Sequence, residues 1–224
     1  MEQELNKIVL DKKTIPTDNK HLFQQTRMFE QLIMMYNCAI REVQTKFEVL
    51  NDDLSVRNRR NPIEMIKTRI KRPESIAEKL ARKGCELSVN SIIKNLNDVA
   101  GVRVICAFVD DIYEVAAMFL RQDDVSLIEV KDYIKNPKPN GYRSYHMIIE
   151  VPVFFADRKQ LMRVEVQFRT IAMDFWASLE HQIKYKKSIE NPDSIMGELK
   201  SCADIIAETD NRMMNIRKKI IFDE

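Results

Sequence analysis

The sequence contains little glycine, proline, cysteine and histidine, and each scarcity excludes a class of structure. There are 4 glycines and 7 prolines among 224 residues. This argues against disorder and against an all-β architecture with many turns, and it favours long helices. Neither a G-x-x-x-x-G-K-S/T loop nor a G-x-G-x-x-G fingerprint occurs. Any bound phosphates must therefore be held by side chains rather than by a glycine-rich backbone.

Cysteine and histidine are too sparse and too scattered for a zinc site. Cys38, Cys85, Cys106 and Cys202 form no C-x-x-C pair, and only 3 histidines accompany them. The chain has no His-Asp dipeptide, which argues against a typical metal-dependent phosphohydrolase. The cysteines are interpreted as reduced packing residues of a cytosolic protein.

Long apolar runs and an excess of one charge are also lacking. No run approaches the ~18 apolar residues of a membrane span, and the N-terminus lacks the pattern of a signal peptide. We therefore expect a cytoplasmic protein without a membrane partner. The 36 basic and 34 acidic residues give a net charge of only +2, so we expect neither DNA nor RNA as a partner.

The hydrophobic pattern predicts an α/β (α+β) chain in which long helices flank a central mixed sheet of about five strands. Residues 1–17 are polar and are expected to be flexible. Residues 18–50 carry an apolar stripe with helical spacing, which serves either a subunit contact or packing on its own domain. A polar break is expected over 51–60. Asn61, Pro62 and Glu64 then predict a helix start, with an interruption near Pro73 and an end at Gly84.

The remaining segments alternate between strand and helix patterns. Apolar and β-branched runs predict strands over 99–109, 125–134, 145–153 and 160–170. Helices are expected over 89–97, 111–121, 171–187 and 192–220. The last strand alternates, so its polar face carries Arg163, Glu165, Gln167 and Arg169. A strand that turns this face to water would explain the pattern equally well.

The stretch PKPNGYRSYHMIIEV, residues 137–151, combines a turn with more chemistry than a turn requires. A hairpin needs only Asn140-Gly141. The chain surrounds this turn with Lys138, Tyr142, Arg143, Tyr145 and His146. This cluster is therefore the first candidate for a binding site.

Two further segments carry charges that suit nucleotide chemistry. Residues 67–83 are rich in lysine and arginine and contain only Glu74 and Glu78 as acids; they suit either a polyphosphate or a solvated helix with i,i+4 pairs. Asp98 alone would be a cap or turn residue. If the sheet brings Asp98 and Glu165 together, they can hold Mg²⁺ against phosphate oxygens. The combination suggests a Mg²⁺-dependent transfer between nucleotides.

Four segments resemble the synthetase domain of the RelA/SpoT-type (p)ppGpp synthetases, and more narrowly a stand-alone small alarmone synthetase of the RelP type. They are RIKRPESIAEKLARKG, NDVAGVRVICAFVDDIYEV, DYIKNPKPNGYRSYHMIIEVP and VEVQFRTIAMDFWASLEHQIKYK. The resemblance implies a nucleotidyltransferase-like synthetase fold over 18–190 with a core at 61–187. It also implies that the C-terminal helix over 191–224 is an oligomerisation element.

The resemblance implies a reaction of the bacterial stringent response, in which the 3′-hydroxyl of GDP or GTP attacks the β-phosphorus of ATP and AMP leaves. Asp98 and Glu165 are implied to hold Mg²⁺, and Glu165 to take the hydroxyl proton. The implied ATP-binding residues are Arg69, Lys71, Ser75, Lys79, Arg82 and Arg103. Those for GDP or GTP are Lys138, Tyr142, Arg143, His146, Gln167 and Asp174, with Tyr142 stacked on guanine. The role of Asp174 stays open, because some relatives carry asparagine there.

Family membership would also imply a homotetramer that makes alarmone and does not hydrolyse it. One branch is stimulated by its product through a Phe-x-Thr element, but the matching positions here read Met65-Ile66-Lys67, which argues against such stimulation. Arg169, Trp176, Glu180 and His181 are expected to support the site mainly as structural residues. Two alternatives remain open: another Mg²⁺-dependent nucleotidyltransferase, such as one that transfers AMP, and a non-catalytic binder of nucleotide or RNA.

Overall fold

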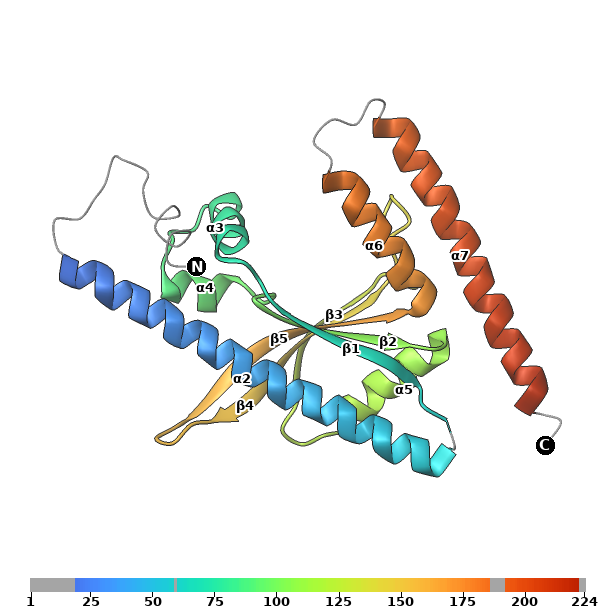
Figure 1. The fold of residues 1–224 in the computed structure, drawn as a ribbon, viewed down its shortest axis with the longest axis horizontal. Coiled ribbons are helices and arrows are strands. Elements are labelled where there is room, and N and C mark those ends of the chain that lie inside the picture. Colours follow the sequence, from blue (N-terminus) through green and yellow to red (C-terminus); the bar gives the residue numbers. More distant parts are fainter. Residues whose placement is uncertain (1–18, 59, 186–191, 222–224) are drawn as a thin grey trace.

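The computed structural model describes residues 19–58, 60–185 and 192–221, so the expected flexible N-terminus lies outside the described residues. The elements follow one another as α2 (Asn19–Asn58), β1 (Ile63–Ile70), α3 (Pro73–Arg82), α4 (Val89–Asn95), β2 (Ala100–Cys106), α5 (Val109–Leu120), β3 (Ser126–Asp132), β4 (Tyr145–Phe154), β5 (Lys159–Thr170), α6 (Ile171–Tyr185) and α7 (Pro192–Ile221). Figure 1 shows this order along the ribbon.

The five strands form one mixed sheet in the order β1-β2-β5-β4-β3. The pairing of β2 with β5 is parallel, and the other three pairings are antiparallel. The predicted α+β architecture is therefore confirmed. The four strands expected from the hydrophobic pattern are β2, β3, β4 and β5, and the fifth is β1.

The helix predicted to start at Asn61 is wrong, because Ile63–Ile70 is the edge strand β1. This segment contains Ile63, Ile66, Thr68 and Ile70, whose branched side chains suit a pleated strand. Its pairing with β2 outweighs the local capping signal. The helix after Pro73 is confirmed as α3, and Gly84 follows it at φ +66 as expected for a helix end.

The polar break predicted after residue 50 is also wrong, because α2 continues to Asn58. Leu54 extends the apolar stripe by one further turn and is buried. The polar residues around it face water, and Asp53 pairs with Arg57 one turn later at 2.8 Å. The polar composition of residues 51–58 therefore does not end the helix, because the apolar stripe continues through Leu54 and packs on the core.

Helices α2 and α5 pack on one face of the sheet, and α2 crosses it diagonally (Figure 1). The rings of Phe47 and Phe119 stack at 4.3 Å, and Phe47 meets Phe168 of β5 edge-on at 5.6 Å. All three side chains are fully buried. The stripe of α2 thus packs on its own domain, while Met28, Met34, Val49 and Val56 remain exposed on it.

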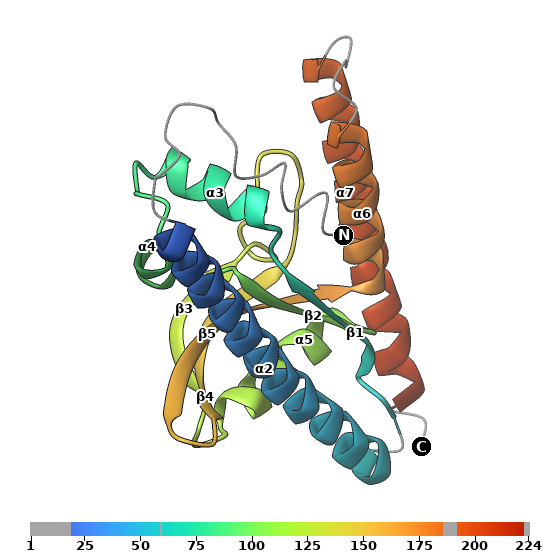
Figure 2. The same ribbon diagram turned by 60° about the vertical axis from the view of Figure 1, so that its left-hand side comes forward.

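Helices α6 and α7 run side by side next to the sheet (Figures 1 and 2). Thr170 caps α6, because its Oγ1 accepts from the backbone N–H of Met173 at 3.1 Å. The same hydroxyl donates to Asp210 of α7 at 2.8 Å. Farther along α7, the Arg217 guanidinium forms ion pairs with Asp110 and the buried Asp111. These contacts fix α7 against the domain.

Two smaller expectations are settled in the described part of the chain. Cys38, Cys85, Cys106 and Cys202 are all free thiols. Cys202 is exposed on α7, so the interpretation of every cysteine as a packing residue is wrong for this one. Among the described helices, none combines the length and apolar character that crossing a bilayer requires.

The buried Asp210 carboxyl gives a stability prediction. Burial raises its pKa, although the Thr170 hydroxyl and the Arg143 charge oppose this. Because its pKa is raised, the ionised Asp210 carboxylate lowers the stability of the folded state. This loss disappears as pH falls and the carboxyl is protonated. Asp210→Asn should therefore raise the free energy of unfolding at pH 7 by up to about 1 kcal/mol, with a smaller gain at pH 4. Urea unfolding measures both; a loss of stability at pH 7 would contradict the argument.

Candidate active site

The strand register brings polar side chains from four strands into two rows on the sheet face opposite α2 and α5. In the first row, Arg69 pairs with Gly101, and Gly101 pairs with Glu165. In the second row, the pairs run from Lys67 to Arg103, Gln167 and His146. Side chains alternate along each strand, so both rows point to the same side. Residues from four separate segments of the sequence therefore lie together.

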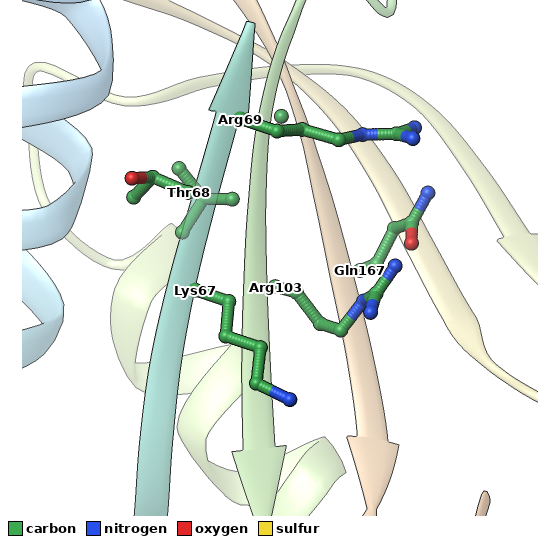
Figure 3. Close-up of a pocket in the computed structure, with 7 residues that line it drawn as sticks. Lys67, Thr68, Arg69, Arg103 and Gln167 are labelled. Carbon is green, nitrogen blue, oxygen red and sulfur yellow. The ribbon is translucent and has the colours of Figure 1, made fainter. Parts of the chain in front are cut away.

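A hollow of about 210 Å³ opens on this face between β1, β2 and β5 (Figure 3). It is lined by Lys67, Thr68, Arg69, Gly101, Val102, Arg103 and Gln167. The Arg69 side chain extends across β2, and a Cβ at Gly101 would lie 3.2 Å from its Cγ and Nε. Glycine at position 101 thus leaves the space through which Arg69 reaches toward Glu165, with 3.7 Å between Nη2 and Oε2.

Asp98 lies just before β2 and is held by two lysines. Its Oδ2 accepts from Lys71 Nζ at 2.7 Å and from Lys79 Nζ at 2.6 Å. Burial alone would raise the pKa of this carboxyl, but the two ammonium groups outweigh burial and leave the pKa below its ordinary value. Its Oδ1 is buried and lacks a partner among the described residues. A buried carboxylate oxygen without a partner is an available ligand for a cation.

Glu165 is largely buried in the centre of the sheet. Gln167 Nε2 donates to its Oε2 at 2.7 Å, and His146 Nδ1 lies 3.5 Å from its Oε1. Burial would raise the pKa of Glu165, but these contacts outweigh it, so the pKa is lowered. The negative charge of Asp98 acts on the same pKa in the opposite direction. The two carboxylates are therefore within electrostatic reach of each other.

Asp174 lies in the first turn of α6, and its carboxylate accepts hydrogen bonds from basic side chains of three strands. Its Oδ1 accepts from Arg103 Nη1 at 3.1 Å and Arg169 Nη1 at 2.9 Å, and its Oδ2 from Lys67 Nζ at 3.0 Å. These partners keep the pKa of Asp174 low, although burial acts to raise it. The sequence had suggested a place near the acceptor's ribose or base. That position stays a prediction, and the structure shows that basic side chains surround Asp174.

The loop before β4 brings Lys138, Tyr142 and His146 together. The Lys138 Nζ lies 5.0 Å from the centre of the Tyr142 ring, and the Tyr142 hydroxyl lies 2.9 Å from His146 Nε2. Gly141 has φ +87, and a Cβ there would lie 2.5 Å from the Cβ of Ala203 in α7. Only glycine satisfies both the turn and this close approach. Helix α7 thus supports the loop from behind.

For Arg143, Arg82 and Ser75 the predicted nucleotide contacts stay predictions. The Arg143 side chain contacts the backbone carbonyl of Ile134 at 3.5 Å, and its charge acts on Asp210 and Tyr113. Arg82 is exposed in the last turn of α3, and Ser75 is half-buried in its first turn. His146 and Gln167 contact Glu165, Tyr142 contacts His146, and Lys138 lies over the Tyr142 ring.

Tyr133 is a member of the cluster that sequence reasoning missed. Its ring lies 4.8 Å from Lys138 Nζ and 5.2 Å from the His146 ring. Tyr133 stands directly after β3, near the end of the strand predicted over 125–134. Its only signal in the sequence is an aromatic residue at the end of a strand that leads into the candidate loop.

The residues present restrict how a metal could be held. Within the described residues, no group of three or more histidine, cysteine, aspartate or glutamate side chains is close enough to enclose an ion. Asp98 and Glu165 offer two carboxylates at most. A divalent ion bound here would therefore complete its coordination with substrate oxygens or water, as Mg²⁺ commonly does.

Comparison with known proteins identifies similar sequences and folds. Residues 68–190 match the family model described as the region found in RelA / SpoT proteins. The chain is 44% identical to the GTP pyrophosphokinase YwaC of Bacillus subtilis over 188 residues, which is 84% of this chain and 90% of that protein. It is 32% identical to the GTP pyrophosphokinase YjbM of the same organism over 194 residues, or 87% and 90% of the two chains.

Solved structures resemble the whole fold. The small alarmone synthetase 2 of Bacillus subtilis superposes with a TM-score of 0.77 at 43% identity, covering 85% of this chain and 98% of that one. The small alarmone synthetase 1 of Bacillus subtilis, bound to its product pppGpp, gives a TM-score of 0.79 at 33% identity, with 86% and 97% covered.

The ion pairs of Asp98 predict how stability depends on pH. Because its pKa is lowered in the fold, its contribution is fully present above the ordinary pKa of 3.8 and is lost as pH falls through the folded value. Asp98→Asn should lower the free energy of unfolding by about 1–3 kcal/mol at pH 7 and by less at pH 3. Urea unfolding at both pH values tests this; an equal loss at both would refute the ion-pair account.

Proposed function

The chain belongs to the RelA/SpoT family, and from this we infer that it is a GTP pyrophosphokinase of the small alarmone synthetase type. It transfers the pyrophosphoryl group of ATP to the 3′-hydroxyl of GDP or GTP, giving ppGpp or pppGpp and AMP. The observation that carries this inference is the pair of rows on one sheet face, in which Arg69 and Arg103 flank Glu165 and Gln167. The match to family members over most of the chain supports the same conclusion.

The donor nucleotide would use the basic side chains at the β1 and β2 side of the site. Lys71 and Lys79 converge within 2.7 Å of one oxygen of Asp98, so their charges point into a common space where a triphosphate could be neutralised. Arg69 and Arg103 line the hollow beside them. Planar guanidinium groups suit both phosphate oxygens and the face of a base.

The acceptor nucleotide would use the loop before β4. The Tyr142 ring is partly buried, and its exposed part would stack on guanine, since base–aromatic stacking contributes about 1–3 kcal/mol. Lys138 and His146 flank this ring and can meet the acceptor's phosphates. The acceptor would then lie next to Glu165, whose Oε1 is 3.5 Å from His146.

Glu165 is the residue that would receive the proton. In the reaction, a bond forms between the 3′-oxygen and the β-phosphorus while the bond from that phosphorus to the bridging oxygen breaks, and AMP leaves with this oxygen. The lowered pKa makes Glu165 a weak base toward an unreacted hydroxyl. Proton transfer is therefore expected only as the attacking oxygen becomes acidic in the transition state. Before that, the carboxylate orients the hydroxyl.

Asp98 and Glu165 would hold Mg²⁺. The buried Oδ1 of Asp98, which has no partner among the described residues, fits this role. When bound, the ion would supply positive charge that offsets the charge developing on the transferred phosphates. Lys71 and Lys79 already share the other oxygen of Asp98 and would turn to the phosphates as ATP enters.

We also propose a cytoplasmic homotetramer acting in the bacterial stringent response. Support for assembly comes from exposed apolar side chains on the two long helices: Met34, Val49 and Val56 on α2, and Ile205, Met213, Ile216 and Ile220 on α7. Exposed apolar groups on neighbouring turns suit helix–helix contacts between subunits.

A product assay tests the activity. Enzyme, Mg²⁺, ATP and GDP should yield AMP and ppGpp in equal amounts by anion-exchange chromatography, and GTP in place of GDP should yield pppGpp. Release of pyrophosphate, with AMP joined to an acceptor, would favour the nucleotidyltransferase alternative. Absence of any product with intact binding of ATP would favour a non-catalytic binder.

Replacement of the proposed base gives a second test. Glu165→Gln should lower kcat by about 100-fold or more, because general acid–base catalysis alone contributes that much, while the thermal unfolding midpoint stays similar. Glu150→Gln is the matched control, since Glu150 lies on the neighbouring strand β4 with Arg163 at 3.7 Å. It should retain wild-type kcat. Wild-type turnover in Glu165→Gln would remove Glu165 from the assigned role.

A further inference from the structure

Asp174, whose role the sequence leaves open, is part of a chain of contacts that ends at the acceptor loop. We propose that Asp174 is a positioning residue: it fixes the Arg169 guanidinium, and Arg169 fixes the ring of Tyr142 on which the acceptor base stacks. This role rests on the proposed function, because it concerns the binding of GDP or GTP. Asp174 itself would not contact the base.

The planar guanidinium group of Arg169 donates hydrogen bonds to both Asp174 and Tyr142. Its Nη1 donates to Asp174 Oδ1 at 2.9 Å, and its Nη2 donates to the Tyr142 hydroxyl at 2.9 Å. The side chain is only 6% exposed. Its Nε is buried and has no hydrogen-bond partner among the described residues. The guanidinium carbon also lies 5.2 Å from the centre of the Tyr142 ring, so the orientation of the group depends on its contacts with Asp174 and Tyr142.

The Tyr142 ring is held at its hydroxyl from two sides. Arg169 donates to the hydroxyl oxygen, and His146 Nε2 lies 2.9 Å from the same oxygen. The ring also packs on the small apolar cluster of Trp176, Ala177 and Ala203. A ring already fixed in one orientation loses less conformational entropy when a base stacks on it. Loss of the Arg169 contact should therefore weaken acceptor binding without removing the stacking surface.

The charges around Asp174 explain why a carboxylate suits this position. Arg103 and Arg169 repel each other: burial and then the charge of Arg169 lower the pKa of Arg103, whereas the charge of Asp174 raises it. One oxygen of Asp174 accepts from both arginines, so the carboxylate offsets the repulsion and holds them side by side. An asparagine has the same shape but no charge, and only one of its two terminal atoms can accept.

Direct recognition of guanine by Asp174 is the competing role. The N1–H and N2 amino groups of guanine need acceptors, and a carboxylate would suit them. In this structure both oxygens of Asp174 already accept from cations, with Lys67 on Oδ2, and the side chain is only 10% exposed. Because three charged donors already occupy its two oxygens, Asp174 has little hydrogen-bonding capacity left for a base.

A double-mutant cycle separates the two roles. GDP affinity would be measured by calorimetry, with a non-hydrolysable ATP analogue at saturation, for wild type, Asp174→Asn, Tyr142→Phe and the double variant. Tyr142→Phe keeps the ring but removes the hydroxyl oxygen that accepts the hydrogen bond from Arg169. If Asp174 acts through that oxygen, each single substitution weakens GDP binding by about tenfold. The double variant then binds GDP no more weakly than whichever single variant has the lower GDP affinity. Multiplied losses would overturn the proposal.

Inosine diphosphate gives an independent readout, because its base lacks the N2 amino group. A positioning role leaves the ratio of GDP to inosine diphosphate affinity unchanged in Asp174→Asn, while both affinities fall. A fall of the ratio toward one would show that Asp174 reads the base and would overturn the proposal. If Asp174→Asn does not fold, Arg169→Lys serves instead, since a lysine cannot bridge both partners; it should weaken GDP binding and keep the ratio.

A matched control and the wild-type protein complete the experiment. Asp124→Asn removes a carboxylate whose ion pair with Lys46 lies at 2.7 Å and joins α2 to the segment after α5, so it should leave GDP affinity unchanged. Wild-type protein that does not bind GDP would remove the proposed function, and with it this role. If the wild-type protein binds GDP but the losses of the two substitutions multiply in the double variant, only the role of Asp174 is removed.

Discussion

The parallel pairing of β2 with β5 is the interaction on which the rest of the site depends. It sets Gly101 beside Glu165 and Arg103 beside Gln167, although these residues are far apart in the sequence. A shift of one residue would turn the polar side chains of β5 toward the apolar face that packs on α2. The buried valines and Phe168 on that face therefore fix the register of the polar face that carries Glu165 and Gln167. Packing energy on one side of the sheet maintains the chemistry on the other.

Charge neutralisation is the second constraint, and it follows from burial. Asp98, Glu165 and Asp174 are all largely buried, and each has basic or amide partners that lower its pKa. The partners of Glu165 and Asp174 lie on β1, β2, β4 and β5, whereas those of Asp98 lie after β1 and on α3, so all three carboxylates have partners before any nucleotide arrives. Partly buried cations that are already gathered in one place suit substrates with several negative charges. The same ion pairs thus stabilise the fold and prepare the site.

Much of this arrangement was predictable from sequence, and the failures have physical causes. The alternation over 160–170 predicted β5 and the polar face that carries Glu165, because period two is a strong local signal. The segment at 63–70 was misassigned since a capping pattern is local, whereas its strand state depends on pairing with β2. The partners of Asp174 could not be predicted, because Lys67, Arg103 and Arg169 meet it only through the sheet order. Arg143 lies in the loop before β4, against the backbone carbonyl of Ile134, and its predicted contact with the acceptor stays a prediction.

The central claim is that one sheet face joins a donor and an acceptor nucleotide so that the β-phosphorus of ATP moves to a guanosine 3′-oxygen. The fate of ATP labelled at its β-phosphorus tests this most directly. The wild-type protein with Mg²⁺ and GDP should place all transferred label in the 3′-pyrophosphate of ppGpp and leave the AMP unlabelled. Label recovered in free pyrophosphate, or retained in an adenosine product, would contradict the account.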